Sequence, residues 1–501
     1  MAKKYYICGM HIAVICYYSI MFKKSVLSGT LLAAAILCGG VCAAQDAVSL
    51  IPADAAVVMR ISTGRILEEN GGEEFLAKVM EMAGLQAAET VSSPKEWGVD
   101  TGKPVYVAIS HDGDASAVIM PLSDAALFGR TVQELCVSRV HRRGDVAWVE
   151  NDGRCAVFDS HVAVAADARG ERDAAWWCRA LEHKEDVGPA TEGFRRMMEA
   201  DADIAVMVSG AIFDEDELAV MKNIYGNDLP IEDISMVWSL SSGRGVAEMR
   251  YGVVPESDAA ARCLAENTAG MQRVEGRYAD CIPASSMLVM YSAIDGGKVS
   301  EALARLPYFA DTGEDEDFAR LRRIVESLSG DMAVVMGAPV IADNNVHVPA
   351  TLMVRVVQKL WTDMPVEKRD GGYVVEADGT NVWIGVRDGD MVISTVDGMM
   401  SLPKASDPAA LVGCRGSYGA FYLDVKQMLA AARPFLELLD SDGSVASLLS
   451  RVDRVEGLAE RPDSFRCTVY LSDGEDNLYS IMADALAAAV AEDAGNGDLA
   501  E

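Results

Sequence analysis

The chain has 501 residues, half of them apolar and 24% charged, so it is too long for one ordinary core and has the composition of a soluble protein. Its 44 Lys and Arg residues are outnumbered by 76 Asp and Glu residues, which gives a formal net charge of −32 at pH 7. So acidic a surface repels phosphate backbones and anionic headgroups, which argues against nucleic acid and against peripheral membrane binding.

The N-terminus has the three parts of an export signal. Residues 21–24 form a basic n-region, residues 26–41 form an apolar stretch, and residues 41–44 offer small-residue cleavage sites. We therefore predict a signal peptide over residues 21–44 and attribute residues 1–20 to an upstream start codon. The protein is expected to be exported to the periplasm or the cell surface of a bacterium.

A lipid anchor is the alternative to free secretion. A bacterial lipobox has a small residue directly before its cysteine, whereas Leu37 precedes Cys38 and Val41 precedes Cys42. Both matches are poor, so free secretion is favoured and lipidation at either cysteine stays open. No later stretch reaches the ~18 apolar residues of a membrane-spanning helix, so we predict no transmembrane span in the mature chain.

The cysteines that follow the signal segment do not form a recognisable framework. None of them forms a C-x-x-C pair, and a chain of this size does not depend on disulfides. We expect most of them to be isolated buried thiols, although export permits pairing and the sequence leaves any pairing open. They are Cys136, Cys155, Cys178, Cys263, Cys281, Cys414 and Cys467.

The first half of the mature chain opens on Ile51-Pro52-Ala53-Asp54, and the apolar run after it predicts a buried strand over residues 55–62. Gly64-Arg65 then leads into a helical pattern. The further elements, in chain order, are a hairpin over 104–122, a helix over 127–136, a hairpin over 145–165, a helix over 173–181, a helix over 194–198 capped by Thr191, a strand over 204–209, a helix over 214–224, a hairpin over 235–251 and a helix from the N-cap Ser257 to Asn267.

The second half repeats these landmarks in the same order. Ile282-Pro283-Ala284 again precedes an apolar run and a Gly-Lys pair, and the V-E-x-D-G of residues 149–153 returns at residues 375–379. Because several landmarks keep their order, we predict an internal duplication with copies over 45–270 and 275–491, a linker near 269–280 and a disordered acidic tail over 492–501. Short turns between the strands predict an α+β fold: two tandem copies with mainly antiparallel sheets and helices packed on them.

The mature start, the Gly-basic helix after it and the second I-P-A copy resemble a family of exported bacterial envelope proteins that is known only as a domain of unknown function. Most members of that family carry a good lipobox, from which this sequence departs at Leu37 and Val41. The resemblance implies an envelope location and the duplicated architecture. The family has no known catalytic residues, so none is carried over to this chain.

Motifs for nucleotides and metals are missing from the sequence. Gly297-Lys298 lacks the first Gly and the final Ser or Thr of a P-loop, and Gly243-Arg244-Gly245 lacks the third Gly of a dinucleotide fingerprint. The histidines of the mature chain show no zinc spacing. Two acidic turns, over 311–317 and 440–443, offer oxygen ligands for calcium, but neither fits an EF-hand loop and we interpret both as solvated turns.

Catalytic arrangements are equally weak. Asp159-Ser160-His161 holds three triad residue types side by side, but neighbours on an extended chain point to opposite faces, so we predict a turn. Trp176 and Trp177 diverge by ~100° on a helix, so at most one is free to stack on a sugar while the other belongs to the core. The sequence therefore predicts no catalytic, cofactor-binding or metal-binding residue, and no cofactor.

Function remains a choice between hypotheses. We favour a non-enzymatic exported envelope protein that acts as a binding or scaffolding module for an envelope protein or a small ligand that the sequence does not identify. The alternative is a periplasmic hydrolase of glycans or peptides that uses dispersed carboxylates, since the spacing of so many acids is uninformative. Self-association is a third hypothesis, and the sequence does not determine the oligomeric state.

Overall fold

A computed structural model describes residues 47–69, 72, 74–75, 97–111, 113, 115–136, 138–151, 153–167, 172–183, 188–225, 229–305, 316–342, 345–356, 367–369, 372–377, 380–387, 389–396, 404–405, 413–439 and 444–484. The chain divides into two compact units. The first unit runs to Ile212 and includes the C-terminal segment from Met482, and the second unit is Phe213–Ile481. The predicted signal segment, the acidic tail and the acidic residues 311–315 and 440–443 lie outside the described residues.

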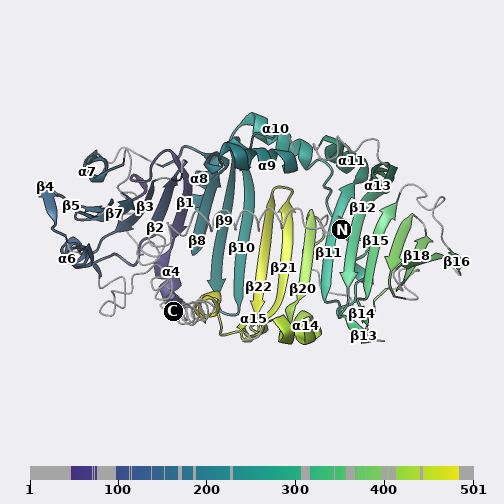
Figure 1. Ribbon diagram of the computed structural model, residues 1–501. Helices are drawn as coiled ribbons and strands as arrows, with labels where there is room; N and C mark the ends of the chain where they lie inside the picture. The colour runs from purple at the N-terminus through teal and green to yellow at the C-terminus, as the bar shows by residue number, and fades with distance from the viewer. Residues whose placement is uncertain are drawn as a thin grey trace, which may run out of the picture. The chain divides into compact units, whose positions relative to one another are not determined.

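The first unit is built on an antiparallel sheet with the strand order β4-β5-β6-β7-β3-β2-β1-β8 (Figure 1). Its central strands are short and apolar, and nearly every residue of β1, β2 and β3 is buried. The strands are β1 (Ala55–Ile61), β2 (Val105–Ser110), β3 (Ser116–Pro121), β4 (His141–Arg143), β5 (Val146–Asn151), β6 (Arg154–Phe158), β7 (Val162–Asp167) and β8 (Ile204–Ser209).

The helices of the first unit follow from local signals. Thr191 caps α8 as predicted, because its hydroxyl accepts a hydrogen bond from the Phe194 backbone N–H at 3.2 Å. Helix α7 packs against β5 and β6 and buries Trp177, Cys178 and Leu181. The helices are α4 (Thr63–Glu68), α6 (Ala125–Cys136), α7 (Ala174–His183), α8 (Glu192–Glu199) and the 3-10 turn η3 (Gly210–Ile212).

The second unit is also an antiparallel sheet, with the strand order β9-β10-β22-β21-β20-β11-β12-β15-β19-β18-β17-β16 and a separate hairpin of β13 and β14. The strands are β9 (Ile234–Gly243), β10 (Val246–Pro255), β11 (Leu288–Asp295), β12 (Leu328–Met336), β13 (Val340–Ala342), β14 (Asn345–His347), β15 (Ala350–Val356), β16 (Glu367–Arg369), β17 (Gly372–Ala377), β18 (Thr380–Arg387), β19 (Asp390–Ser394), β20 (Gly419–Asp424), β21 (Val452–Arg461) and β22 (Ser464–Leu471).

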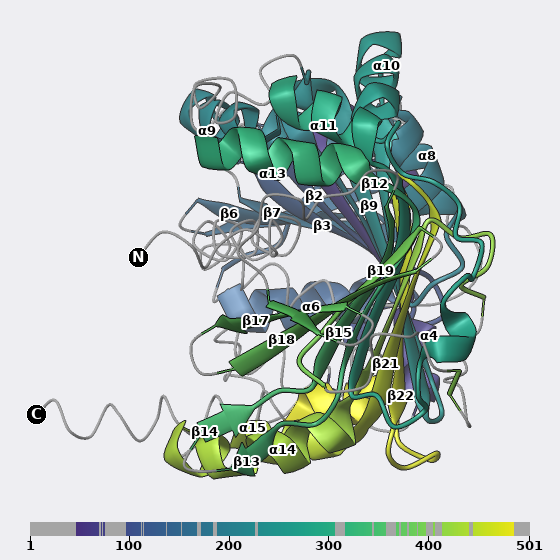
Figure 2. The same cartoon turned by 90° about the vertical axis from the view of Figure 1, so that its right-hand side faces the viewer.

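Helices of the second unit lie mainly at the ends of its strands. In Figure 2, α11 and α13 lie at one end of the strands, and α14 and α15 lie at the other. Ser257 caps α10 as predicted, with its hydroxyl 3.2 Å from the Ala260 backbone nitrogen. The helices are α9 (Glu215–Tyr225), α10 (Asp258–Asn267), α11 (Gly296–Arg305), α13 (Glu316–Ser327), α14 (Val425–Leu439), α15 (Ser444–Ser450) and the 3-10 turns η4 (Ile231–Asp233) and η5 (Ala279–Cys281).

The predicted α+β class is therefore wrong. The prediction gave each copy its own sheets with helices packed on them, whereas extended antiparallel sheet dominates the described residues. Strand β10 pairs with β22 over Val246↔Tyr470 to Gly252↔Ser464, so the closing strands of the two predicted copies belong to one ladder. Periodicity in the sequence identified the strands but carried no information on which strand edges would meet, or on whether helices would cover a face.

The strand order around β1 is the same as that around β11. Starting from an edge strand, the first order is β4-β5-β6-β7-β3-β2-β1-β8 and the second is β16-β17-β18-β19-β15-β12-β11-β20, so each strand of the first has a counterpart at the same position in the second. The compact units nevertheless divide between Ile212 and Phe213 and not near residue 270. The limits of the two predicted copies, 45–270 and 275–491, stay a prediction.

Candidate functional site

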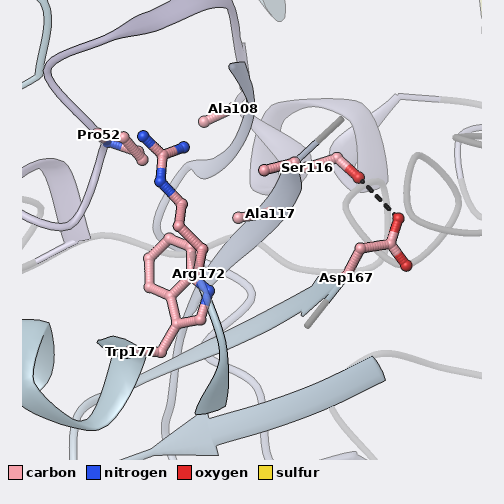
Figure 3. A pocket seen from close by; sticks show the side chains of 8 residues that line it. Pro52, Ala108, Ser116, Ala117, Asp167, Arg172 and Trp177 are labelled. Carbon is pink, nitrogen blue, oxygen red and sulfur yellow. Dashed lines mark hydrogen bonds between the residues drawn. The ribbon is translucent and has the colours of Figure 1, made fainter. Parts of the chain in front are cut away.

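The first candidate site is a hollow beside the I-P-A-D segment of the first unit (Figure 3). Arg172 forms an ion pair with Asp54 and lies over the Trp176 ring, 5.3 Å from its centroid. Trp177 is buried, and its indole Nε1 has no hydrogen-bond partner among the described residues. The hollow admits no water molecule, so we interpret it as a packed junction and not as a ligand cavity.

The two tryptophans divide as predicted, because Trp177 is 1% exposed and belongs to the core. Trp176 is partly exposed, but the Arg172 guanidinium lies over its ring, and the Trp177 ring meets it edge-on at 4.6 Å between centroids. With its neighbours placed in this way, the Trp176 ring offers little surface for stacking on a sugar.

Asp159, Ser160 and His161 form a turn, as predicted. The Asp159 carboxylate accepts hydrogen bonds from the backbone N–H groups of His161 at 2.7 Å and of Val162 at 2.8 Å. This is an Asx-type turn that connects β6 to β7. This carboxylate oxygen therefore holds the turn, and no triad is assigned to the segment.

The thiols and the metal-ligand residue types give no reactive centre in the part of the chain that the structure describes. The seven cysteines there are free, and burial raises the pKa of the Cys155 thiol to about 12, which keeps it protonated and poorly nucleophilic. No three His, Cys, Asp or Glu side chains of the described residues gather closely enough to hold a metal ion. None of the described helices is long and apolar enough to cross a bilayer.

The second candidate site is a buried polar network in the second unit. The guanidinium of Arg277 donates from Nε and Nη2 to the two carboxylate oxygens of Asp390, each at 2.7 Å. Tyr278 donates its hydroxyl to Asp390 at 2.9 Å, and Tyr291 donates its hydroxyl to Asp331 at 2.9 Å. Burial, together with the neighbouring carboxylates, raises the pKa of both tyrosines, so both hydroxyls stay protonated donors.

This network fixes a chain segment and leaves no carboxylate oxygen for chemistry. Asp331 also accepts hydrogen bonds from the backbone N–H groups of Glu275 at 2.9 Å and Arg277 at 2.6 Å. Every oxygen of both carboxylates therefore has a donor, which is the arrangement of a structural network and not of a general acid paired with a base. Neither aspartate was predicted from the sequence, although a lone Asp after Gly330 near the start of an apolar strand is a usable signal.

The segment held by the network is the predicted linker. Its backbone bonds to the sheet, with the Gln272 N–H donating to Ala293 O at 2.8 Å and the Val274 N–H donating to Ser417 O at 2.7 Å. The side chains of Val274, Tyr278 and Ile282 pack in one core with residues of β11, β12, β15 and β19. The connection between the predicted copies is thus a packed part of the second unit.

The third candidate site is one face of the same sheet. In an antiparallel ladder, residues directly opposite each other point to the same face. The pairings place one uninterrupted row of uncharged residues across β9, β10, β22, β21, β20, β11, β12 and β15. That row is Leu240, Met249, Cys467, Gly457, Phe421, Met290, Val334 and Leu352.

The flanking rows have the same character. One is Ser242, Ala247, Val469, Val455, Leu423, Leu288, Met336 and Ala350, and the other is a short row of three residues, Trp238, Tyr251 and Phe465, across β9, β10 and β22. We call these three rows together the apolar face. Phe421 and Phe465 crowd the position of Gly457 so closely that a Cβ there would lie 2.3 Å from one ring and 2.4 Å from the other. The absence of a side chain at Gly457 lets the two rings close over the middle of the face.

Among the residues that the structure describes, most of the apolar face is partly exposed, although Ala247 is buried. Residues of β9, β10, β20, β21 and β22 are mostly half-buried, and Met249 and Met290 are 40% and 45% exposed. Where the face continues towards the other edge of the sheet it closes into a core cluster that includes Val354, Ile384 and Met391. The apolar face is therefore partly exposed to solvent over β9, β10, β20, β21 and β22, and is buried in a core cluster towards β18 and β19.

On β10, β21 and β22, the side opposite the apolar face carries charged residues, whereas the apolar face carries none. Arg466 lies 3.6 Å from Glu248 and 3.0 Å from Glu460, and the Arg454 guanidinium lies 3.7 Å from the centroid of the Tyr470 ring. Water solvates this side adequately. The exposed apolar face has no such explanation, and contiguous exposed apolar surface of this kind marks interaction sites.

The comparisons with known proteins place the chain in no family. No protein-family model matches it, and no curated protein matches it. Among solved structures, crystal form III of TP0453 is similar at 10% identity over 46% of this chain and 89% of that one, with a TM-score of 0.30. Crystal form I of TP0453 is 10% identical over 44% of this chain and 85% of that one, with a TM-score of 0.28. Crystal form IV is 8% identical over 43% of this chain and 94% of that one, with a TM-score of 0.29. Likeness at these TM-scores supports no argument about function, so the site is interpreted from its own residues.

Proposed function

We propose that the protein is an exported binding or scaffolding module of the cell envelope and that the apolar face of the second unit is its binding surface. The exposed, continuous apolar row across the sheet supports this proposal, because a soluble chain normally covers such a surface. The export signal predicted over residues 21–44 supports the envelope location. The buried carboxylates Asp331 and Asp390 are engaged in a structural network, so no observation favours the hydrolase alternative.

A ligand screen tests the binding function. The full chain is heated with calcium, oligosaccharides, peptidoglycan fragments, peptides and monomeric short-chain lipids, and the unfolding transition of each mixture is compared with that of the protein alone. A ligand that binds only the folded state raises the melting temperature, with about 2.7 kcal/mol expected at a hundredfold excess over its dissociation constant. We expect at least one class to do so.

The second measurement is local. Hydrogen exchange of β9, β10, β22 and β20 is followed with and without the ligand that raises the melting temperature, and the strands of the apolar face should become better protected. The binding function would be refuted if none of these ligand classes raised the melting temperature and none changed the exchange of these strands. Protection confined to the first unit would refute the assignment of the surface.

A further inference from the structure

We infer that the apolar face takes up the acyl chains of a single zwitterionic lipid molecule. The inference rests on the proposed binding function and specifies its ligand. Among the rows that define the face there is no Asp, Glu, Lys or Arg side chain, and the polar side chains in them are few. Such a surface gives its ligand dispersion contacts and release of water, with few hydrogen bonds, which suits a hydrocarbon chain.

The sheet backbone excludes one alternative, an added peptide strand. From β10 to β15 every strand of the ladder is paired on both of its edges, so the N–H and C=O groups beneath the apolar face are already used. A peptide laid on this face would leave its own backbone groups without partners from the sheet, at a cost in free energy. An acyl chain has no such groups.

Methionine is unusually frequent on the face and suits a ligand of variable shape. Met249, Met290 and Met336 belong to the rows that define it, and Met236 and Met332 lie on the same side of β9 and β12, each two residues along the strand from a member of the face. Unbranched thioether side chains adjust to irregular partners and are common on surfaces that accept several ligands. Acyl chains that differ in length and unsaturation are partners of this kind.

The net charge of the chain disfavours two other occupants of the apolar face, a second copy of the chain and an anionic lipid. A formal net charge of −32 makes two copies repel each other, so a second copy is a poor occupant of the face. The same charge repels an anionic headgroup and an anionic bilayer surface. A lipid with a zwitterionic headgroup avoids this repulsion, and it is bound as a separate molecule whose chains lie on the sheet.

The test uses diheptanoyl phosphatidylcholine below its micelle-forming concentration as the probe, titrated into the full chain and followed by calorimetry. The variant carries Met249→Lys and Met290→Lys, two side chains exposed enough to be changed without loss of the fold. The control is Val220→Lys on α9, which is 59% exposed and lies outside the apolar face. Circular dichroism and the unfolding transition of all three proteins confirm that they are folded.

We expect the double variant to bind the probe at least tenfold more weakly than the unchanged chain, because each lysine places a charge where the hydrocarbon lies. The control should bind within twofold of the unchanged chain, and diheptanoyl phosphatidylglycerol should bind more weakly than phosphatidylcholine. Equal binding of the probe by variant and control would overturn the inference, as would binding to bilayer vesicles without binding to the monomeric lipid. Sedimentation that shows a dimer dissociated by the same two lysines would identify a second copy as the occupant instead.

Failure of the inference is distinguishable from failure of the binding function. If lipid does not bind but another ligand class raises the melting temperature and the double variant abolishes that shift, the surface is confirmed and the lipid is wrong. If no ligand class binds, both proposals fall together.

Discussion

The central strands of the two units differ in how far their apolar residues are buried. In the first unit, β1, β2 and β3 are apolar on both faces apart from Arg60 and the terminal serines of β2 and β3, and they are buried almost throughout. In the second unit, β10, β21 and β22 carry charged or polar residues on one side and mainly apolar residues on the other, and both kinds stay mostly half-exposed. Antiparallel sheets commonly solvate one face, but the solvated face is normally the polar one. An apolar face that stays open is available for a function other than stability.

The largest expected effect compares one substitution in both sheets. Val118→Lys places a charge at a fully buried position in β3, between β2 and β7, and should lower the free energy of unfolding by more than about 4 kcal/mol. Met249→Lys lies on the open face of β10 and should cost less than about 1 kcal/mol. Urea denaturation followed by circular dichroism measures both. Equal losses in the free energy of unfolding would show that the apolar face of the second unit is covered in solution, and would contradict the difference between a buried and an exposed sheet.

The polar network should be the part of the second unit that is most sensitive to substitution. Asp390→Ala leaves the buried Tyr278 hydroxyl without its acceptor and removes the partner of the partly exposed Arg277, which together should cost about 2 kcal/mol. Hydrogen exchange of residues 271–282 should accelerate, since the network holds this segment on the sheet. The control is Asp280→Ala, whose exposed carboxylate lies 4.0 Å from Lys404. A similar loss in both variants would contradict the structural role of the network.

A smaller, pH-dependent effect is expected where the β9–β10 turn meets the end of β22. The Asp476 carboxylate accepts hydrogen bonds from Arg451, which lowers its pKa, and the Asp476 carbonyl accepts one from the Gly245 N–H. A lowered pKa stabilises the fold above the unfolded-state value of about 3.9, and this contribution is lost as the pH falls through the still lower folded-state value. Asp476→Asn should therefore cost about 1.5 kcal/mol at pH 7 and progressively less below about pH 4.

The matched control for that experiment is Glu475→Gln. Glu475 lies 3.4 Å from Arg244, but both side chains are almost fully exposed, so the pair should contribute nothing measurable at either pH. Urea denaturation of the unchanged chain and of both variants, at pH 7 and at pH 3, gives the free energies of unfolding to compare. A difference between Asp476→Asn and the unchanged chain that stays constant with pH would contradict the assignment to this carboxylate.

Much of the local structure was predictable, and the reason is that its signals are local. Thr191 and Ser257 were identified as N-caps because the side chain and the backbone N–H that it accepts from are three residues apart. The Asp159 turn has the same short range. The pairing of β10 with β22 joins residues more than two hundred positions apart, and no periodicity in either strand indicates its partner.

The candidate site could not be predicted from the sequence either, because its residues come together only through pairings between distant strands. Met249, Gly457, Phe421 and Met290 become one row only when four pairings are known. The alternation of polar and apolar residues in β10 predicts that one face is apolar, but it predicts equally well a face that is covered. Asp331 and Asp390, which meet around Arg277 and its neighbours, lie far apart in the sequence and have no motif.

The smallest expected effect tests whether the two units respond separately. Thr191→Ala removes the cap of α8 in the first unit, and Ser257→Ala removes the cap of α10 in the second, each at a cost of about 1 kcal/mol. Since stability is not uniform across a structure, each loss should appear as faster hydrogen exchange within the unit that holds the cap, with the other unit unchanged. Substitution by Gly is the control for each, since Gly at an N-cap costs only a few tenths of a kcal/mol. If either cap variant accelerates exchange equally in β2 and in β22, the units unfold as one, and the contrast between a buried and an open sheet is a contrast within a single cooperative structure.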